Sequence, residues 1–159
     1  KLKLEFIEGS QHVILCGEDV SEKIRTPEVS MEASRISAIP EVRSFLLDLQ
    51  KKIARENNII MDGRDIGTVI LPNADLKIFL TASPEERAER RYKELKQAGN
   101  DTVTYEGILE DIKQRDYNDM HRETAPLKKA DDAVILDTTG MTVEESVDRL
   151  LDMVKNLGE

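Results

Sequence analysis

LKIFLTASPEE, residues 76–86, is the stretch that decides the fold class of this chain. Its first half, residues 76–80, is an apolar run that predicts a buried strand. Its second half, Ser83-Pro84-Glu85-Glu86, has the pattern of a helix capping box with proline at the first helical position. A buried strand that leads within a few residues into a helix is typical of α/β proteins.

The same order recurs along the chain. Residues 133–136 form a second apolar run, which leads into the capping box Thr142-Val143-Glu144-Glu145, and residues 59–61 form a third apolar run. Helical spacing predicts two more elements: a helix through Tyr105, Ile108, Leu109 and Ile112, and a last helix through Val143, Val147, Leu150, Leu151 and Val154. Strands that alternate with helices predict a parallel sheet with flanking helices, here a thin one of three strands.

The first third of the chain has a different pattern. Leu2, Leu4 and Phe6 alternate with polar residues, Gly9-Ser10 supplies a turn and residues 13–15 resume an extended chain, which predicts an antiparallel hairpin. A short helix is predicted from Thr26 as N-cap and Pro27 as first helical residue. A second helix is predicted after Pro40, with apolar residues at helical spacing: Val42, Phe45, Leu46, Leu49 and Ile53.

Composition and charge narrow the class of protein. The 159 residues are 39% hydrophobic and 35% charged, which suits one ordinary domain. The net charge of −9 disfavours binding to a nucleic-acid polymer, and no apolar run approaches the length of a membrane span. The single cysteine, Cys16, lies in an apolar run, which predicts a small core or sheet residue in a reduced, cytoplasmic setting.

The most informative charged segment is Met61-Asp62-Gly63-Arg64-Asp65-Ile66-Gly67-Thr68. Ligands of open α/β sheets bind beyond the carboxyl ends of the strands, so three charged side chains on a loop with glycine at its hinges indicate a functional loop. The alternative is a hairpin, because Asp-Gly between apolar residues is a strong turn signal. Gly67 and Pro72 disfavour a strand that returns directly after this turn, and so disfavour the hairpin.

Two further groups of charged residues stand on predicted helices. Arg115, Asp119 and Arg122 would share one helix face, and the simplest interpretation of that spacing is an exposed ladder of ion pairs. On the helix after Ser83, the spacing of Glu86 with Arg90 and of Glu89 with Lys93 predicts surface pairs. Arg87, Arg90 and Arg91 crowd that same helix, and by themselves they indicate solvated side chains.

Longer strings carry a family resemblance. DGRDIGT (residues 62–68), LPNADLKIFL (residues 71–80) and ASPEERAERR (residues 82–91) closely resemble bacterial cytidylate kinases. Three shorter strings match the same family: GEDV at residues 17–20, APL at residues 125–127 and LDTT at residues 136–139. The resemblance covers essentially the whole chain, in order.

The resemblance implies an α/β P-loop nucleoside-monophosphate kinase fold with four segments. Residues 1–56 correspond to the monophosphate-binding region with its enlarged insert, which contains a small antiparallel sheet. Residues 57–89 and 116–159 correspond to the core, and residues 90–115 correspond to a helical lid.

The resemblance also implies residue roles. Ser34, Arg43 and Asp65 resemble the set that binds the cytosine base. Arg64 and Arg122 resemble the contacts to the acceptor phosphate, and Arg115 and Asp119 resemble a pair near the ribose and phosphates. Arg90 and Arg91 resemble lid arginines that reach the transferring phosphoryl group. Asp62 is expected to shape the loop and not to touch the substrate.

The implied activity is phosphoryl transfer from ATP to CMP or dCMP, with Mg²⁺ arriving on the ATP. The string G-x-x-x-x-G-K-[ST], which binds ATP phosphates in this fold, is missing from these 159 residues. We therefore expect that an N-terminal piece is absent and that the chain by itself is inactive.

Other interpretations stay open at this point. The chain could be a noncatalytic pyrimidine-nucleotide-binding module, a kinase for another small molecule, or a purely structural α/β fragment. His12 and His121 lack companions for a protein-bound metal site, which we do not expect. We expect a monomer.

Overall fold

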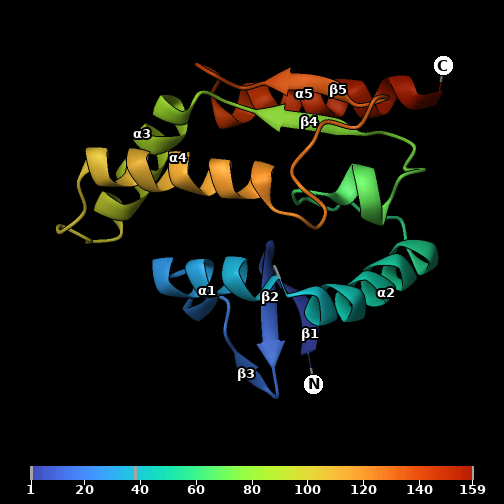
Figure 1. The fold of residues 1–159 in the computed structure, drawn as a ribbon, viewed down its shortest axis with the longest axis horizontal. Helices are drawn as coiled ribbons and strands as arrows, with labels where there is room; N and C mark the ends of the chain where they lie inside the picture. The colour runs from blue at the N-terminus through green and yellow to red at the C-terminus, as the bar shows by residue number, and fades with distance from the viewer. Residues whose placement is uncertain (1, 38, 159) are drawn as a thin grey trace. The chain divides into compact units, whose positions relative to one another are not determined.

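The computed structural model describes residues 2–37 and 39–158. The chain divides into two units, residues 1–49 and residues 50–159. Each unit is described separately below, and Figure 1 shows their elements.

The first unit opens with the predicted hairpin. Strands β1 (Leu2–Ile7) and β2 (Ser10–Leu15) pair antiparallel, and a two-residue strand, β3 (Glu18–Asp19), pairs with β2 on the other side. The turn between β1 and β2 is Glu8-Gly9, one residue before the predicted Gly9-Ser10, because Ser10 already pairs with Ile7 in the ladder. Both turn residues have positive φ, as the twist of a two-residue hairpin requires.

The turn between β2 and β3 corrects the expectation for Cys16. Cys16 and Gly17 form a second two-residue turn with φ values of 54° and 92°. Cys16 is exposed there, so the prediction of a core or sheet residue is wrong. The apolar run ends one residue earlier, because the chain must reverse at this point to pair Leu15 with Glu18.

Two helices follow, as predicted. After a short 3₁₀ turn, η1 (Lys23–Arg25), helix α1 spans Pro27–Ser37 and helix α2 spans Pro40–Glu56. Thr26 caps α1, because its hydroxyl accepts a hydrogen bond from the Val29 amide at 3.3 Å.

The second unit contains the parallel sheet. Strands β4 (Ile78–Thr81) and β5 (Val134–Asp137) pair in parallel with Leu80 opposite Leu136. Three helices follow these strands in the α/β order: α3 (Pro84–Gln97), α4 (Tyr105–His121) and α5 (Val143–Lys155), with a last 3₁₀ turn, η3 (Asn156–Gly158). The α/β fold class predicted from the sequence is confirmed.

The predicted third strand, residues 59–61, is wrong. This segment is extended but belongs to no ladder, and Ile60 is fully exposed. A strand needs the amides and carbonyls of a neighbour. Among the described residues, β4 pairs only with β5, so residues 59–61 have no neighbouring strand.

The two predicted capping boxes differ. At α5 both halves form: the Thr142 hydroxyl accepts from the Glu145 amide, and the Glu145 carboxylate accepts from the Thr142 amide. At α3 only the Ser83 hydroxyl caps, accepting from the Glu86 amide at 3.1 Å. The Ser83 amide donates to the Thr139 hydroxyl instead, at 2.9 Å, which connects α3 to the loop after β5.

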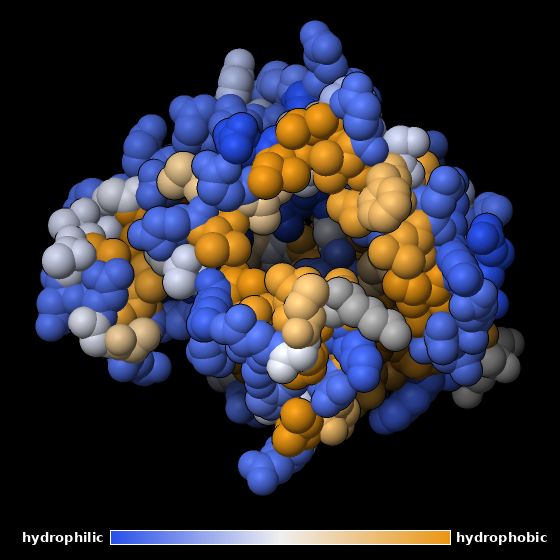
Figure 2. Space-filling view, turned by 90° about the horizontal axis from the view of Figure 1, so that it is seen from below, coloured by the Kyte–Doolittle hydropathy of each residue, from blue (hydrophilic) through white to orange (hydrophobic). Residues whose placement is uncertain are grey.

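The buried apolar residues of the described chain all lie in the second unit: Ile70, Ala82, Ala88, Ile108 and Leu136. Many larger apolar side chains reach the surface, where orange areas lie among hydrophilic ones (Figure 2). The predicted apolar face of α5 belongs to this exposed set, with Val143 at 75% exposure and Val154 at 50%. None of the described helices has the length and hydropathy to cross a bilayer.

Candidate functional site

The loop at residues 62–65 is held at its end by a short π-helical segment, η2 (Ile66–Ile70). The Asp65 carbonyl accepts hydrogen bonds from the amides of Val69 and Ile70, at 2.9 and 3.3 Å. The chain thus passes from the loop directly into a helical turn, and the hairpin alternative is wrong. The Asp65 side chain is buried at this junction, whereas Arg64 beside it is exposed.

Gly63 in the loop and Gly67 in η2 each lie close to another side chain. A Cβ atom on Gly63 would lie 2.9 Å from Cγ1 of Ile66, closer than real contacts allow. A Cβ atom on Gly67 would lie 3.3 Å from the stem of Lys77, at the start of β4. These approaches hold the loop and η2 compactly against the parallel sheet.

The C-terminal end of α4 supplies the opposite side of the site. Asp119 lies in the last turn of α4 and is 7% exposed. Arg122 caps the helix with its amide, which donates to the Asn118 carbonyl, and leaves the helical conformation. The chain then turns back through Ala125, which has a φ of 49°, and the Leu127 amide donates to the Asp119 carbonyl at 2.8 Å.

Four side chains from these two elements meet: Arg64, Asp65, Asp119 and Arg122, which we call the charged quartet. The Nε atom of Arg64 donates to Oδ2 of Asp119 at 2.9 Å, across 55 residues of sequence. A terminal nitrogen of Arg122 lies 3.7 Å from Oδ1 of Asp65. The prediction of an exposed ladder along α4 is therefore wrong, because Asp119 is buried and pairs with a residue outside its helix.

Arg122 is the least solvated cation of the quartet. Its side chain is 16% exposed, and its Nε atom donates to the Ala125 carbonyl at 2.7 Å. Its terminal nitrogen NH2 is buried and makes no hydrogen bond with any described residue. It is the same nitrogen that lies 3.7 Å from Oδ1 of Asp65, so the buried carboxylate partly compensates its charge while its hydrogen-bond donors stay unused among the described residues.

The other predicted arginines lie on α3 and α4. Arg115 is exposed on α4, one helical turn before Asp119. Arg90 donates to the Thr138 carbonyl at 2.6 Å and to the Met141 carbonyl at 3.3 Å, both after β5, and also pairs with Glu86. Arg91 pairs with Glu94 on its own helix at 2.8 Å.

Ser34 and Arg43 lie in the first unit. Ser34 is half-buried on α1, and its carbonyl accepts from the Ser37 hydroxyl. Arg43 is half-buried on α2 and donates to the Ser37 carbonyl at 3.2 Å. Their grouping with the quartet around a base stays a prediction.

Sequence reasoning missed two long-range ion pairs near the site. Arg87, expected to be solvated, forms a two-pronged pair with Asp116 of α4, which raises the pKa of the Arg87 guanidinium. Lys77 binds both carboxylate oxygens of Asp132, at 2.6 and 2.8 Å, and lowers the pKa of that carboxyl. No spacing rule reveals either pair, because the partners are 29 and 55 residues apart.

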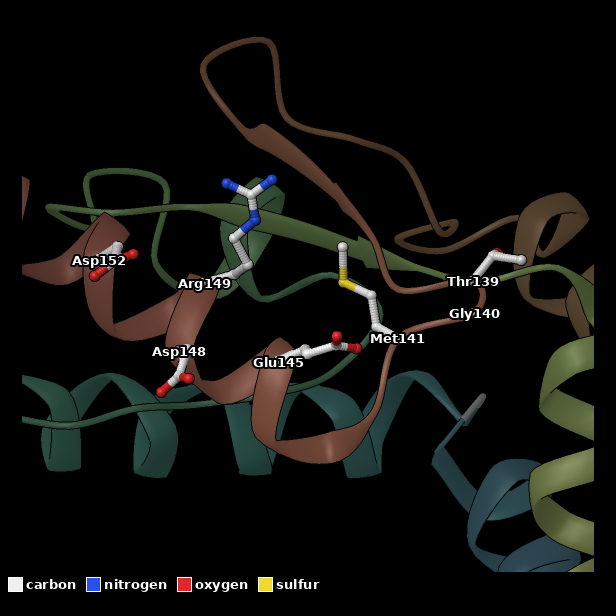
Figure 3. Close-up of a pocket in the computed structure, with 7 residues that line it drawn as sticks. All are labelled: Thr139, Gly140, Met141, Glu145, Asp148, Arg149 and Asp152. Atoms are coloured by element: carbon white, nitrogen blue, oxygen red, sulfur yellow. The ribbon is translucent and has the colours of Figure 1, made fainter.

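A separate open pocket of about 470 Å³ lies where the loop after β5 enters α5. Figure 3 shows its lining: Thr139, Gly140, Met141, Glu145, Asp148, Arg149 and Asp152. Met141 and Arg149 point to the same side in that view, whereas Asp148 points away. The pocket contains none of the predicted site residues. Across residues 2–37 and 39–158, no group of three or more His, Cys, Asp or Glu side chains is placed to hold a metal ion.

Comparison with known proteins decides the family. The sequence model of the cytidylate kinase family matches residues 1–156. The chain belongs to the cytidylate kinase family. Membership in it carries the P-loop nucleoside-monophosphate kinase fold, and the β4–α3 and β5–α5 units form part of that fold's parallel sheet and helices.

Several individual cytidylate kinases are closely similar. The cytidylate kinase of Caldicellulosiruptor bescii is 54% identical over 152 residues, which are 96% of this chain and 67% of the relative. The one of Caldicellulosiruptor saccharolyticus is 53% identical, with the same coverage of both chains. The cytidylate kinase of Carboxydothermus hydrogenoformans is 48% identical over 97% of this chain and 70% of its own length.

Proposed function

We propose that the protein transfers the γ-phosphoryl group of ATP to CMP or dCMP, giving (d)CDP and ADP, as a step of pyrimidine nucleotide metabolism. A phosphate oxygen of the acceptor attacks the γ-phosphorus, and the bond from that phosphorus to the β-phosphate oxygen breaks. Family membership supports this reaction over a noncatalytic binding module, because the similar proteins are named cytidylate kinases.

One observation carries the proposal to particular residues. The terminal nitrogen of Arg122, which lies 3.7 Å from Asp65 and makes no hydrogen bond with any described residue, and the exposed guanidinium of Arg64 belong to the same charged quartet. Guanidinium groups bind phosphate oxygens two at a time and stay charged. We therefore assign Arg64 and Arg122 to the acceptor phosphate, where they would neutralise charge spread over its oxygens.

Asp65 is proposed to read the base, together with Ser34 and Arg43. Cytosine carries an amino donor at the position where uracil carries a carbonyl acceptor. A carboxylate accepts from the amino group and meets an unfavourable oxygen in uracil, which would reject UMP. The burial of Asp65 supports this assignment, since discrimination of this kind is strongest away from water.

The remaining roles are assigned on the same basis. Arg115 and Asp119 are proposed to lie near the ribose and phosphates, with Asp119 orienting Arg64 through the 2.9 Å bond. Arg90 and Arg91 are proposed to reach the transferring phosphoryl group. For Arg90 this requires exchanging the Thr138 and Met141 carbonyls for phosphate oxygens.

The proposed regions are those of the family fold. Residues 1–56 bind the monophosphate, residues 90–115 form the lid, and residues 57–89 and 116–159 form the core. Mg²⁺ is proposed to arrive with ATP, held by the phosphates, and would neutralise their charge. We propose a cytoplasmic monomer.

Calorimetric titration of the chain with CMP, dCMP, UMP and AMP tests the proposal. We expect binding of CMP and dCMP in preference to UMP and AMP. Because the 159 residues contain no G-x-x-x-x-G-K-[ST] string, transfer from ATP is expected only where such a segment is also present. Failure of both cytidine nucleotides to bind would refute the proposed function.

A further inference from the structure

The guanidinium of Arg87 connects three elements of the second unit. Its Nε atom donates to the Ala82 carbonyl at 3.1 Å, directly after β4. Its two terminal nitrogens donate to the two carboxylate oxygens of Asp116 on α4, at 3.0 and 2.5 Å. Arg87 itself lies in the first turn of α3, so one planar group connects the end of β4, α3 and α4.

The other contacts between α3 and α4 constrain the two helices less than the Arg87–Asp116 pair does. Helices α3 and α4 pack against each other and cross in the view of Figure 1, and Ala88 of α3 is fully buried. A second pair between the two helices, Lys113 with Glu85, is longer at 3.5 Å, and both of its side chains are about half exposed. Exposed pairs of this kind contribute little, whereas a two-pronged arginine pair fixes both distance and orientation.

Helix α4 ends in half of the charged quartet. Asp119 lies three residues after Asp116, so the two carboxylates are neighbours along the helix surface. Arg122 follows at the helix end. Any shift or rotation of α4 at Asp116 therefore displaces Asp119 from Arg64 and Arg122 from Asp65.

We propose that Arg87 is a positioning residue for the acceptor-phosphate site. By binding both Asp116 and the Ala82 carbonyl, Arg87 holds α4 in place. In that place Asp119 orients Arg64, and Arg122 faces the loop. Arg87 touches no substrate in this role. The inference rests on the proposed function, because it assigns Arg64 and Arg122 to the phosphate of CMP.

The variant Arg87→Lys tests the geometry while keeping the charge. A lysine ammonium is a point charge and cannot bind Asp116 in a two-pronged way while also donating to Ala82. Since misplacement of binding groups by about 1 Å can cost up to about 100-fold, we expect the Kd for CMP to rise about tenfold. The Kd for cytidine, which has no phosphate, should stay unchanged.

The matched control is Lys93→Ala on the same helix, which removes only the exposed pair with Glu89 and should leave both Kd values unchanged. The double variant Arg87→Lys/Asp116→Asn should bind CMP no worse than Arg87→Lys alone, because both changes break one connection. Equal losses for CMP and cytidine would indicate a general structural role and overturn the inference.

Hydrogen exchange gives a readout that needs no ligand. In Arg87→Lys the Leu127 amide, which donates to Asp119 at the end of α4, should exchange faster. The Thr138 amide, which donates to Thr81 between the strands, should keep its wild-type rate. If the wild-type chain fails to bind CMP, the proposed function is wrong and exchange alone decides whether Arg87 positions α4. Unchanged exchange at Leu127 overturns the inference in either case.

Discussion

The charged quartet and the outer surface of α3 use the same residue types in opposite ways. On the outer surface of α3, Glu89 pairs with Lys93 within one helical turn. In the quartet, Arg64 pairs with Asp119 across 55 residues of sequence. The side chains of Glu89 and Lys93 are 48% and 67% exposed, whereas the side chain of Asp119 is 9% exposed.

We propose that this difference separates surface charge from functional charge. An exposed pair within one helix is screened by water and salt, and either member can be lost at little cost. A partly buried pair between two elements orients its members, and the orientation is what a phosphate or base contact requires. The predictions below test this separation in order of decreasing effect.

Arg122→Ala should have the largest effect. Hydrogen bonds to charged groups contribute about 1.5–3 kcal/mol, so the Kd for CMP should rise by about 10- to 100-fold. Cytidine lacks the phosphate, and its Kd should change much less. Titration of both ligands into wild type and variant provides the comparison. An equal loss for the two ligands would mean that Arg122 does not hold the phosphate.

Asp65→Asn should have the next largest effect, on specificity. A well-placed polar contact to a base discriminates by about 1–3 kcal/mol, so the preference for CMP over UMP should fall by about 5- to 150-fold. Asp62→Asn is the matched control, because Asp62 is an exposed carboxylate on the same loop. A preference that survives in Asp65→Asn would remove Asp65 from the base site.

Asp19 offers a smaller, pH-dependent effect in a local network. Its pKa is lowered from 3.8 to about 2, first by the Ser21 hydroxyl at 2.6 Å, then by the Ser21 amide and by His12. The depressed pKa stabilises the folded hairpin above pH 3.8, and this contribution is lost as the pH falls through 2. Carbon NMR titration of the Asp19 carboxyl should give the low value in wild type. In Ser21→Ala it should move up toward 3.8, and an unchanged value would contradict the assigned cause.

Glu89→Gln should have almost no effect. It removes one exposed pair within α3, so the free energy of unfolding should change by less than about 0.5 kcal/mol. Denaturant unfolding of wild type and variant measures the change, and CMP binding should be the same in both. If Glu89→Gln lowered the free energy of unfolding by more than this, the exposed pair on α3 would not be dispensable, and its contrast with the quartet would be wrong.

Elements with local signals were predicted well. The hairpin, the α1 cap at Thr26 and the complete capping box at Thr142 all formed where expected, since each depends on residues at most a few positions apart. The strands were displaced by one or two residues: the run at 76–80 became Ile78–Thr81. The apolar run at 59–61 failed as a strand because apolar character does not supply a pairing partner.

The site was predicted as a set of residues and not as a geometry. Arg64 and Asp65 were singled out in a string that resembles the family, whereas Asp119 and Arg122 were singled out by their helical spacing and given roles from the resemblance. Their pairing was not, and the spacing along α4 favoured an exposed ladder in place of the buried Asp119. Arg87 was taken as solvated, because Asp116 lies on a different helix.

The amino-acid sequence by itself determined the helix caps at Thr26 and Thr142, the β1–β2 hairpin, the α/β order and the family, because these depend on short spacings and continuous strings. Only the tertiary structure decided which arginine meets which carboxylate. Such a pair depends on how a loop and a helix, tens of residues apart, pack against the same sheet. Burial then decides whether the pair is an exchangeable surface feature or an oriented part of a site.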